Sequence, residues 1–102
     1  MLFQLTMFPT GKATIGSSQA VAKVIDVIDR SGYPYIMGSM STVIEGDWNG
    51  VMKLIDKARR TLRRSHDRVY ISITVDDRAG AKNRLTGKIA SIERTLNRKV
   101  RT

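Results

Sequence analysis

Residue types with well-known catalytic chemistry are few in this chain and poorly matched to one another. His66 stands beside Asp67, a pair that could act as a general base. No serine nucleophile is recognisably paired with it, and the chain has no cysteine. A loop histidine after a helix is expected to be a solvated end group. We therefore predict a protein that binds a partner and catalyses no reaction.

Motifs for metal or phosphate are incomplete. Asp76 and Asp77 could chelate a divalent cation, but adjacent strand residues point to opposite faces, so an ion pair with Arg78 is favoured. The segment 11–18 has the glycines of a phosphate loop but no lysine after the second glycine. Helix N-termini can still hold an anion. We predict anion contacts from Lys12, Arg78 and Lys88, and no metal or cofactor.

Length and charge limit the possible functions. The 102 residues predict one domain spanning 1–102. Residues 1–58 contain five basic and five acidic residues, whereas 59–102 contain thirteen and four, which accounts for the whole net charge of +9. The basic half should attract phosphates or acidic partners. The absence of cysteine and of a long apolar stretch favours a cytoplasmic protein with no membrane partner.

Hydrophobic spacing predicts four strands and three helices. Strict alternation predicts strands over 3–8 and 69–76, and two short strands over 35–37 and 42–45 should form a hairpin. Apolar residues at helical spacing predict three helices, whose N-terminal caps are expected to be Ser17 or Ser18, Asp47 and Thr86. The predicted buried stripes are Val21, Val24, Ile25 and Ile28; Val51, Leu54, Ile55, Ala58 and Leu62; and Ile89, Ile92 and Leu96.

The order of these elements predicts an α+β fold of the ferredoxin-like βαββαβ kind with an added C-terminal helix. Right-handed crossovers make the first and third strands central in a four-stranded antiparallel sheet, with the two main helices on one face. The other face should then be free of helices. Its predicted residues are Gln4, Thr6, Phe8, Val43, Glu45, Tyr70, Ser72 and Thr74.

This helix-free face has three possible uses. An antiparallel sheet can leave such a face in water. Its mixture of aromatic, apolar, hydroxyl, amide and carboxylate groups also suits a partner subunit or a small ligand. We expect a subunit interface, with or without a ligand, to be its main use.

Four segments resemble the thiamine-binding protein family. They are Thr42–Trp48 with Val51-Met52, Phe8–Gly11, Ser72–Arg78 and Gly87–Ile89. The resemblance covers nearly the whole chain and implies a ferredoxin-like fold, a homotetramer, and binding of thiamine or its hydroxymethylpyrimidine half. Two segments depart from the family. The hairpin turn 38–41 replaces a more usual Pro-Met-Gly, and the segment after Pro9 is rich in threonine and lysine.

The resemblance makes Glu45 the first expected ligand residue. Its carboxylate could accept hydrogen bonds from the ring nitrogen and exocyclic amine of a protonated aminopyrimidine. Alternatively, it pairs with a nearby arginine or lysine. Trp48 could stack on a ring or a thiazolium cation, although packing against protein is favoured. The expected hydroxyl contacts are Thr6, Thr42, Ser72 and Thr74.

Two other functions remain open from the sequence. Paired arginines, Arg59-Arg60 and Arg63-Arg64, lie on the outer face of the second predicted helix and could grip nucleic acid phosphates. RNA could also stack on Phe8 and Tyr70, but the glycine-aromatic motif of RNA-binding sheets is missing. The third possibility is a structural or regulatory oligomer that binds no metabolite.

Overall fold

The computed structural model describes residues 1–11, 17–80 and 82–101. The elements follow the predicted order, and their bounds are β1 (Leu2–Pro9), α1 (Ser17–Arg30), β2 (Tyr35–Met37), β3 (Thr42–Glu45), α2 (Trp48–Arg63), β4 (Val69–Asp76) and α3 (Arg84–Leu96). None of these helices is both long and apolar enough to cross a membrane.

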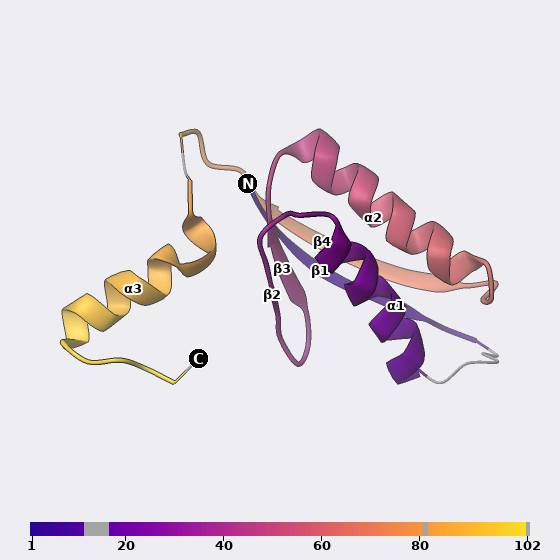
Figure 1. Cartoon of the computed structure of the whole chain (residues 1–102), viewed down its shortest axis with the longest axis horizontal. Helices are drawn as coiled ribbons and strands as arrows, with labels where there is room; N and C mark the ends of the chain where they lie inside the picture. The colour runs from indigo at the N-terminus through magenta and orange to yellow at the C-terminus, as the bar shows by residue number, and fades with distance from the viewer. Residues whose placement is uncertain (12–16, 81, 102) are drawn as a thin grey trace.

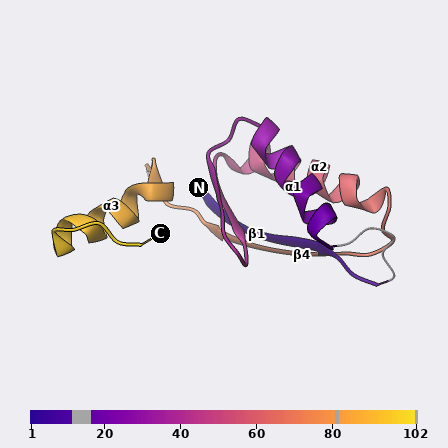
Figure 2. The same ribbon diagram turned by 60° about the horizontal axis from the view of Figure 1, so that its bottom comes forward.

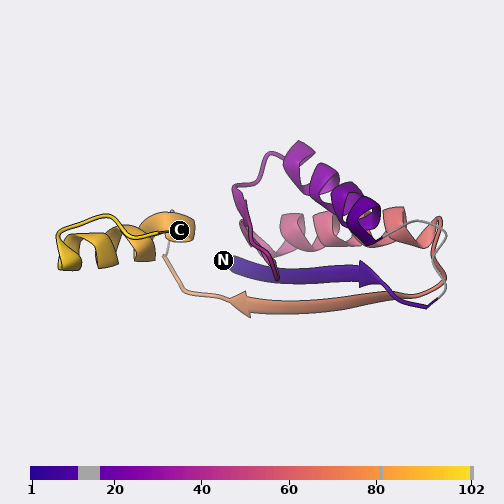
Figure 3. The same ribbon diagram turned by 90° about the horizontal axis from the view of Figure 1, so that it is seen from below.

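The four strands form one antiparallel sheet in the order β2-β3-β1-β4. The first and third strands are central, as predicted. Helices α1 and α2 lie on one face, and the opposite face carries no helix (Figures 1 and 3). The ferredoxin-like α+β arrangement is thus confirmed.

The core lies between the sheet and these two helices. Alternation along β1 sends Phe3, Leu5 and Met7 to the helix side, where all three are buried beside Ile44 of β3. All five residues of the predicted α2 stripe are buried. In α1 the stripe shifts: Ala20, Val24 and Ile28 are buried, whereas Val21 is 38% exposed.

The start of α2 has the predicted cap and a close packing contact. The amide of Gly50 donates to the Asp47 carboxylate over 2.7 Å, and the Tyr33 hydroxyl donates to the same carboxylate over 2.9 Å. These two bonds lower the pKa of Asp47, with the Gly50 amide the larger cause. A Cβ on Gly50 would lie 1.7 Å from the Tyr33 hydroxyl oxygen, so glycine permits this approach.

The expectation of a solvated His66 is wrong, because the side chain is only 4% exposed. The chain folds back at the end of α2, and the His66 amide donates to the Leu62 carbonyl. Ring atom Nδ1 lies 3.1 Å from the same carbonyl oxygen. The histidine therefore helps to end the helix from a buried position.

Helix α3 lies beyond the end of the sheet, away from α1 and α2 (Figures 1 and 2). It begins at Arg84, so the predicted Thr86 cap is wrong. Asn83, which precedes the helix, makes no capping bond with its side chain. Ile92 and Leu96 of the predicted buried stripe remain 43% and 46% exposed.

Candidate functional site

A small cavity of about 220 Å³ lies between α1, the second half of β1 and the tip of the β2–β3 hairpin. Figure 1 shows this tip beside α1. We call this cavity the hairpin pocket. It is lined by Leu5, Thr6, Met7, Phe8, Val21, Val24, Ile25, Met37, Gly38, Ser39, Met40, Ser41 and Thr42. It unites two residues of the predicted ligand set, Thr6 and Thr42.

The pocket exists because β3 is shorter than β1. Pairing between them runs from Leu2↔Glu45 to Leu5↔Thr42, whereas β1 continues to Pro9 against β4. On the β3 side, the backbone from Thr6 onward has no strand partner within the described residues. That unpaired edge of a central strand borders the cavity and offers polar backbone groups to a ligand.

Hydrogen bonds fix the hairpin tip over the end of β1. The Gly38 amide donates to the Ser41 carbonyl over 2.8 Å, which closes the turn. The Gln4 side-chain amide donates to the Ser41 hydroxyl over 3.1 Å, and the Thr6 hydroxyl donates to the Met40 carbonyl over 3.3 Å. Thr6 therefore retains acceptor capacity, and Ser41 retains a donor.

Thr42 supplies a buried hydroxyl to the pocket. Its register opposite Leu5 puts its side chain on the helix-covered side of the sheet, where it is 7% exposed. Within the described residues no side-chain hydrogen bond involves this hydroxyl. A hydroxyl that lines an open cavity can donate to or accept from a polar ligand atom.

The side chains lining the hairpin pocket are uncharged, but an acidic groove adjoins it. This groove, about 490 Å³, shares Val21, Ile25 and Met37 with the pocket and also contains Asp26 and Asp29 of α1. The Tyr35 hydroxyl donates to Asp29 over 2.8 Å, which raises the pKa of Tyr35. Acidic side chains therefore lie near the pocket, although the chain as a whole is basic.

The helix-free face collects other predicted residues. Ser72 is paired with Thr6 in the sheet, and Thr74 with Gln4, so these side chains share one face. Ser72 and Thr74 are exposed. Further along, the rings of Phe8 and Tyr70 stack with centroids 5.0 Å apart. This surface is open, and Thr42 lies on the opposite side of the sheet.

The carboxylate of Glu45 already has partners. One oxygen accepts from the Arg84 amide over 2.8 Å and the other from the Leu85 amide over 3.3 Å. Glu45 thus satisfies the first unpaired N–H groups of α3, as a capping side chain would, from a distant part of the sequence. The predicted alternative of a side-chain ion pair is replaced by bonds to backbone amides.

Trp48 lies apart from the hydroxyls of the helix-free face. Its ring centroid is 6.0 Å from that of Phe3, a residue on the helix-covered side, and the rings are tilted by 43°. The indole is 48% exposed. The structure therefore shows packing against protein, the favoured interpretation of this residue.

Of the three predicted anion residues, Arg78 is the one whose side chain the structure describes. Lys12 lies outside the described residues, and only the backbone of Lys88 is described, within α3. Arg78 is exposed and lines a groove of about 760 Å³ with Lys82 and Arg84, between the end of the sheet and α3. Within the described part of the chain, no group of three His, Cys, Asp or Glu residues could hold a metal ion.

The predicted ion pair of Asp76 and Asp77 with Arg78 differs from the contact that Asp76 makes. Asp76 instead pairs with Arg84, which the start of α3 brings back to the end of β4. The hydrogen bond from Arg84 is the main reason that the pKa of Asp76 is lowered. The same contact raises the pKa of Arg84.

Sequence reasoning missed the apolar wall of the hairpin pocket. Val21 was assigned to the core, and Met37 and Met40 received no role, although they are 58% and 87% exposed. The sequence feature that could have indicated this wall is the pair of methionines beside the Gly-Ser turn, since methionine side chains adapt their shape to ligand surfaces.

The fold and the hairpin pocket together define a ferredoxin-like α+β domain with a concave site of small-molecule size at a strand edge. The chain belongs to the thiamine-binding protein family, whose model matches residues 3–93.

Relatives agree with this membership over nearly the full chain. UPF0045 protein Mb1933 of Mycobacterium bovis is 36% identical over 97 residues, covering 94% of this chain and 92% of the relative. A crystal structure of the hypothetical protein MJ1052 from Methanocaldococcus jannaschii superposes with a TM-score of 0.78 at 28% identity, covering 89% of this chain and 93% of that one. The structure of a Thermotoga maritima protein proposed to act in thiamine biosynthesis or salvage superposes with a TM-score of 0.77 at 19% identity. The superposition covers 89% of this chain and 96% of that one, and shows that the two proteins share the fold.

Proposed function

We propose that this protein is a non-catalytic binding protein for thiamine or its hydroxymethylpyrimidine half, and that the ring occupies the hairpin pocket. The observation that carries the proposal is a cavity of about 220 Å³ that combines apolar walls with Thr42 and with the strand edge at Thr6. An engineered cavity of about 150 Å³ binds benzene, so this space suits a substituted six-membered ring. The thiamine-binding family membership supplies the ligand class.

The proposed contacts follow the polarity of the pocket. Methyl and ring carbons would lie against Val21, Ile25 and Met37, where apolar area is removed from water. Ring nitrogens and the exocyclic amine would bond to the Thr42 hydroxyl and to the unpaired backbone edge of β1 from Thr6 onward.

A cationic thiazolium fits the same site. It would extend into the adjoining groove toward Asp26 and Asp29. This placement lessens the repulsion between a chain of net charge +9 and a cation, because the groove contains Asp29 and also Asp26, which pairs with Arg30 over 3.0 Å.

The other predicted ligand residues lie outside the hairpin pocket. Ser72, Thr74 and the helix-free face remain a predicted subunit interface in a cytoplasmic homotetramer. Glu45 can serve as a ligand carboxylate only if the Arg84 and Leu85 amides release it, and Trp48 only if a ligand reaches the end of the sheet where Phe3 lies.

Isothermal calorimetry with thiamine, its phosphates and hydroxymethylpyrimidine tests this function. We expect binding of at least one of them at sub-millimolar concentration. Heats no larger than dilution for every compound would refute the proposed function.

A further inference from the structure

The outward side of α2 carries a continuous row of positive charge. Lys53, Lys57, Arg60 and Arg64 are separated by four, three and four residues, a spacing that puts side chains in line along one side of a helix. All four are exposed. We call this row the basic stripe.

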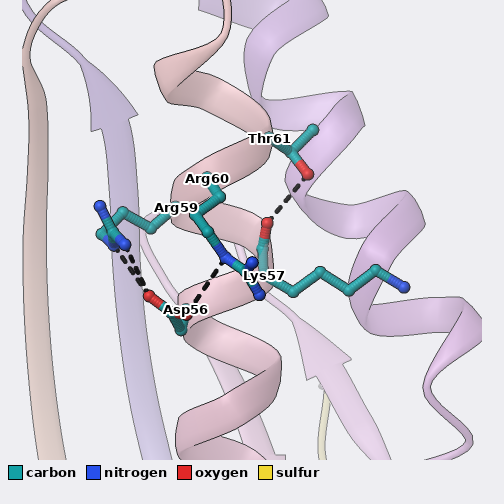
Figure 4. A network of polar contacts seen from close by, with 5 residues as sticks. All are labelled: Asp56, Lys57, Arg59, Arg60 and Thr61. Carbon is teal, nitrogen blue, oxygen red and sulfur yellow. Dashed lines mark hydrogen bonds and ion pairs between the residues drawn. The ribbon is translucent and has the colours of Figure 1, made fainter.

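Little acidic charge offsets the basic stripe. Asp56 is the only acidic residue of α2, and its carboxylate is shared by two arginines, with distances of 2.8 Å to Arg59 Nη2 and 3.2 Å to Arg60 Nε. Figure 4 shows both arginines turned toward Asp56, whereas Lys57 extends in another direction. One carboxylate thus serves Arg59 and Arg60, and Lys57 projects its charge into solvent.

The C-terminal half of the stripe borders a shallow depression of about 520 Å³ lined by Lys57, Arg60, Thr61, Arg63 and Arg64. The Thr61 hydroxyl donates to the Lys57 carbonyl over 2.9 Å, so its oxygen can still accept a hydrogen bond. Arg63 Nε donates to the His66 carbonyl over 3.2 Å, which holds that guanidinium near the rim. Four cationic groups therefore surround one solvent-filled hollow.

The chemistry of the stripe favours nucleic acid over a membrane. Helices that lie on membranes insert their apolar side into lipid. The apolar side of α2, formed by Val51, Leu54, Ile55, Ala58 and Leu62, is buried against the sheet. The basic stripe itself offers no aromatic residue for stacking on exposed bases. The partner that this chemistry still fits is the phosphate backbone of a nucleic acid duplex.

We propose that the basic stripe binds the phosphate backbone of duplex nucleic acid without reading its sequence. The stripe spans eleven residue-to-residue steps of about 1.5 Å each, roughly 16 Å, which matches about five base-pair steps of about 3.4 Å. Four basic side chains over that length can meet about four phosphates. This activity is separate from the proposed metabolite binding, because none of the stripe residues lines the hairpin pocket.

The test is fluorescence anisotropy of labelled duplex DNA between about 50 and about 200 mM salt. With about four phosphate contacts, the slope of log affinity against log salt should be about −3.6, and affinity should fall by roughly 150-fold over this range. Lys57→Gln/Arg64→Gln should halve the slope, leaving a fall of about 12-fold. Arg98→Gln/Lys99→Gln removes the same charge from exposed residues outside the stripe, and should keep the slope within about 0.5 of that of the unmodified chain.

Three results would overturn the inference. Equal loss in the two double variants would mean that net charge alone attracts DNA. Absence of DNA binding would remove the activity. Binding to anionic phospholipid vesicles at concentrations where the duplex is not bound would assign the stripe to a membrane. Circular dichroism of both variants confirms that a changed slope does not reflect unfolding.

Discussion

The hairpin pocket and the Glu45–α3 junction lie at opposite ends of the sheet and use their polar groups in opposite ways. At the junction, both carboxylate oxygens of Glu45 accept amides from Arg84 and Leu85. In the pocket, the Thr42 hydroxyl and the edge of β1 adjoin empty space. The Glu45 carboxylate thus has both oxygens occupied within the chain, although Arg84 Nη1 of the same junction is buried without a partner in the described residues, whereas the pocket has capacity left for a ligand.

This contrast shows that residue type alone does not identify a binding group. A carboxylate is the stronger hydrogen-bond acceptor, but bonds to α3 already compete for it. A threonine hydroxyl forms weaker hydrogen bonds. If it has no partner within the protein, however, a bond to a ligand contributes its full net free energy to binding. Four experiments distinguish the two regions.

Filling the pocket should have the largest effect. Val21→Trp adds a bulky ring at a position that lines the cavity and is 38% exposed, so the fold should tolerate it. We expect thiamine affinity to fall by more than about 100-fold in calorimetry, since ligand and indole compete for one space. Gln19→Trp places the same ring at an exposed position of α1 that lines neither the pocket nor the acidic groove, and should bind within about threefold of the unmodified protein. Equal losses in both variants would argue against the pocket.

Removing one hydroxyl from the pocket should have a smaller effect. Thr42→Val keeps the branched shape but deletes the hydrogen-bonding oxygen, which we expect to weaken binding about tenfold, the value of one hydrogen bond of about 1.4 kcal/mol. Ser72→Ala removes a hydroxyl from the helix-free face and should leave affinity unchanged. If Ser72→Ala has the larger effect, the ligand lies on the helix-free face.

Changing the junction should affect α3 and spare the ligand. Glu45→Gln replaces a charged acceptor with a neutral amide that has one acceptor oxygen. We expect hydrogen exchange at the start of α3 to quicken about tenfold, because charge-assisted bonds are roughly twice as strong as neutral ones. Thiamine affinity should stay within about twofold. A large loss of affinity with unchanged exchange would make Glu45 a ligand residue.

Acid should weaken the same junction. Hydrogen bonding from Arg84 holds the pKa of Asp76 below its unfolded value of about 3.9. The stabilisation is therefore complete above that value and is lost as pH falls through the lower folded pKa. We expect Asp76→Asn to reduce the dependence of thermal unfolding on pH below about 4. Asp77→Asn, at the next exposed position, is the matched control and should retain the full dependence.

The sequence predicted the body of the fold because short-range patterns determine it. Alternation in β1 and β4 and the five-residue stripe of α2 each bury one side of an element, and the structure confirms them. The Asp47 cap is equally local, since donor and acceptor lie three residues apart. Such features need no knowledge of distant contacts.

Features that depend on distant contacts were mispredicted or missed. Glu45 meets Arg84 across 39 residues of chain, so capping patterns near Thr86 could not reveal the true start of α3. His66 is buried by a turn at the end of α2 that hydrogen-bonds back to Leu62. The pocket depends on the unequal lengths of β1 and β3, which alternation does not specify.

The most direct test of the central claim is an amide chemical-shift map of the protein titrated with thiamine. With thiamine in the hairpin pocket, we expect the largest shifts at Thr6–Phe8, around Val21 and across the turn from Met37 to Thr42, with Arg84 and Leu85 unmoved. Shifts centred on Glu45 and the start of α3, with the hairpin turn unaffected, would contradict it.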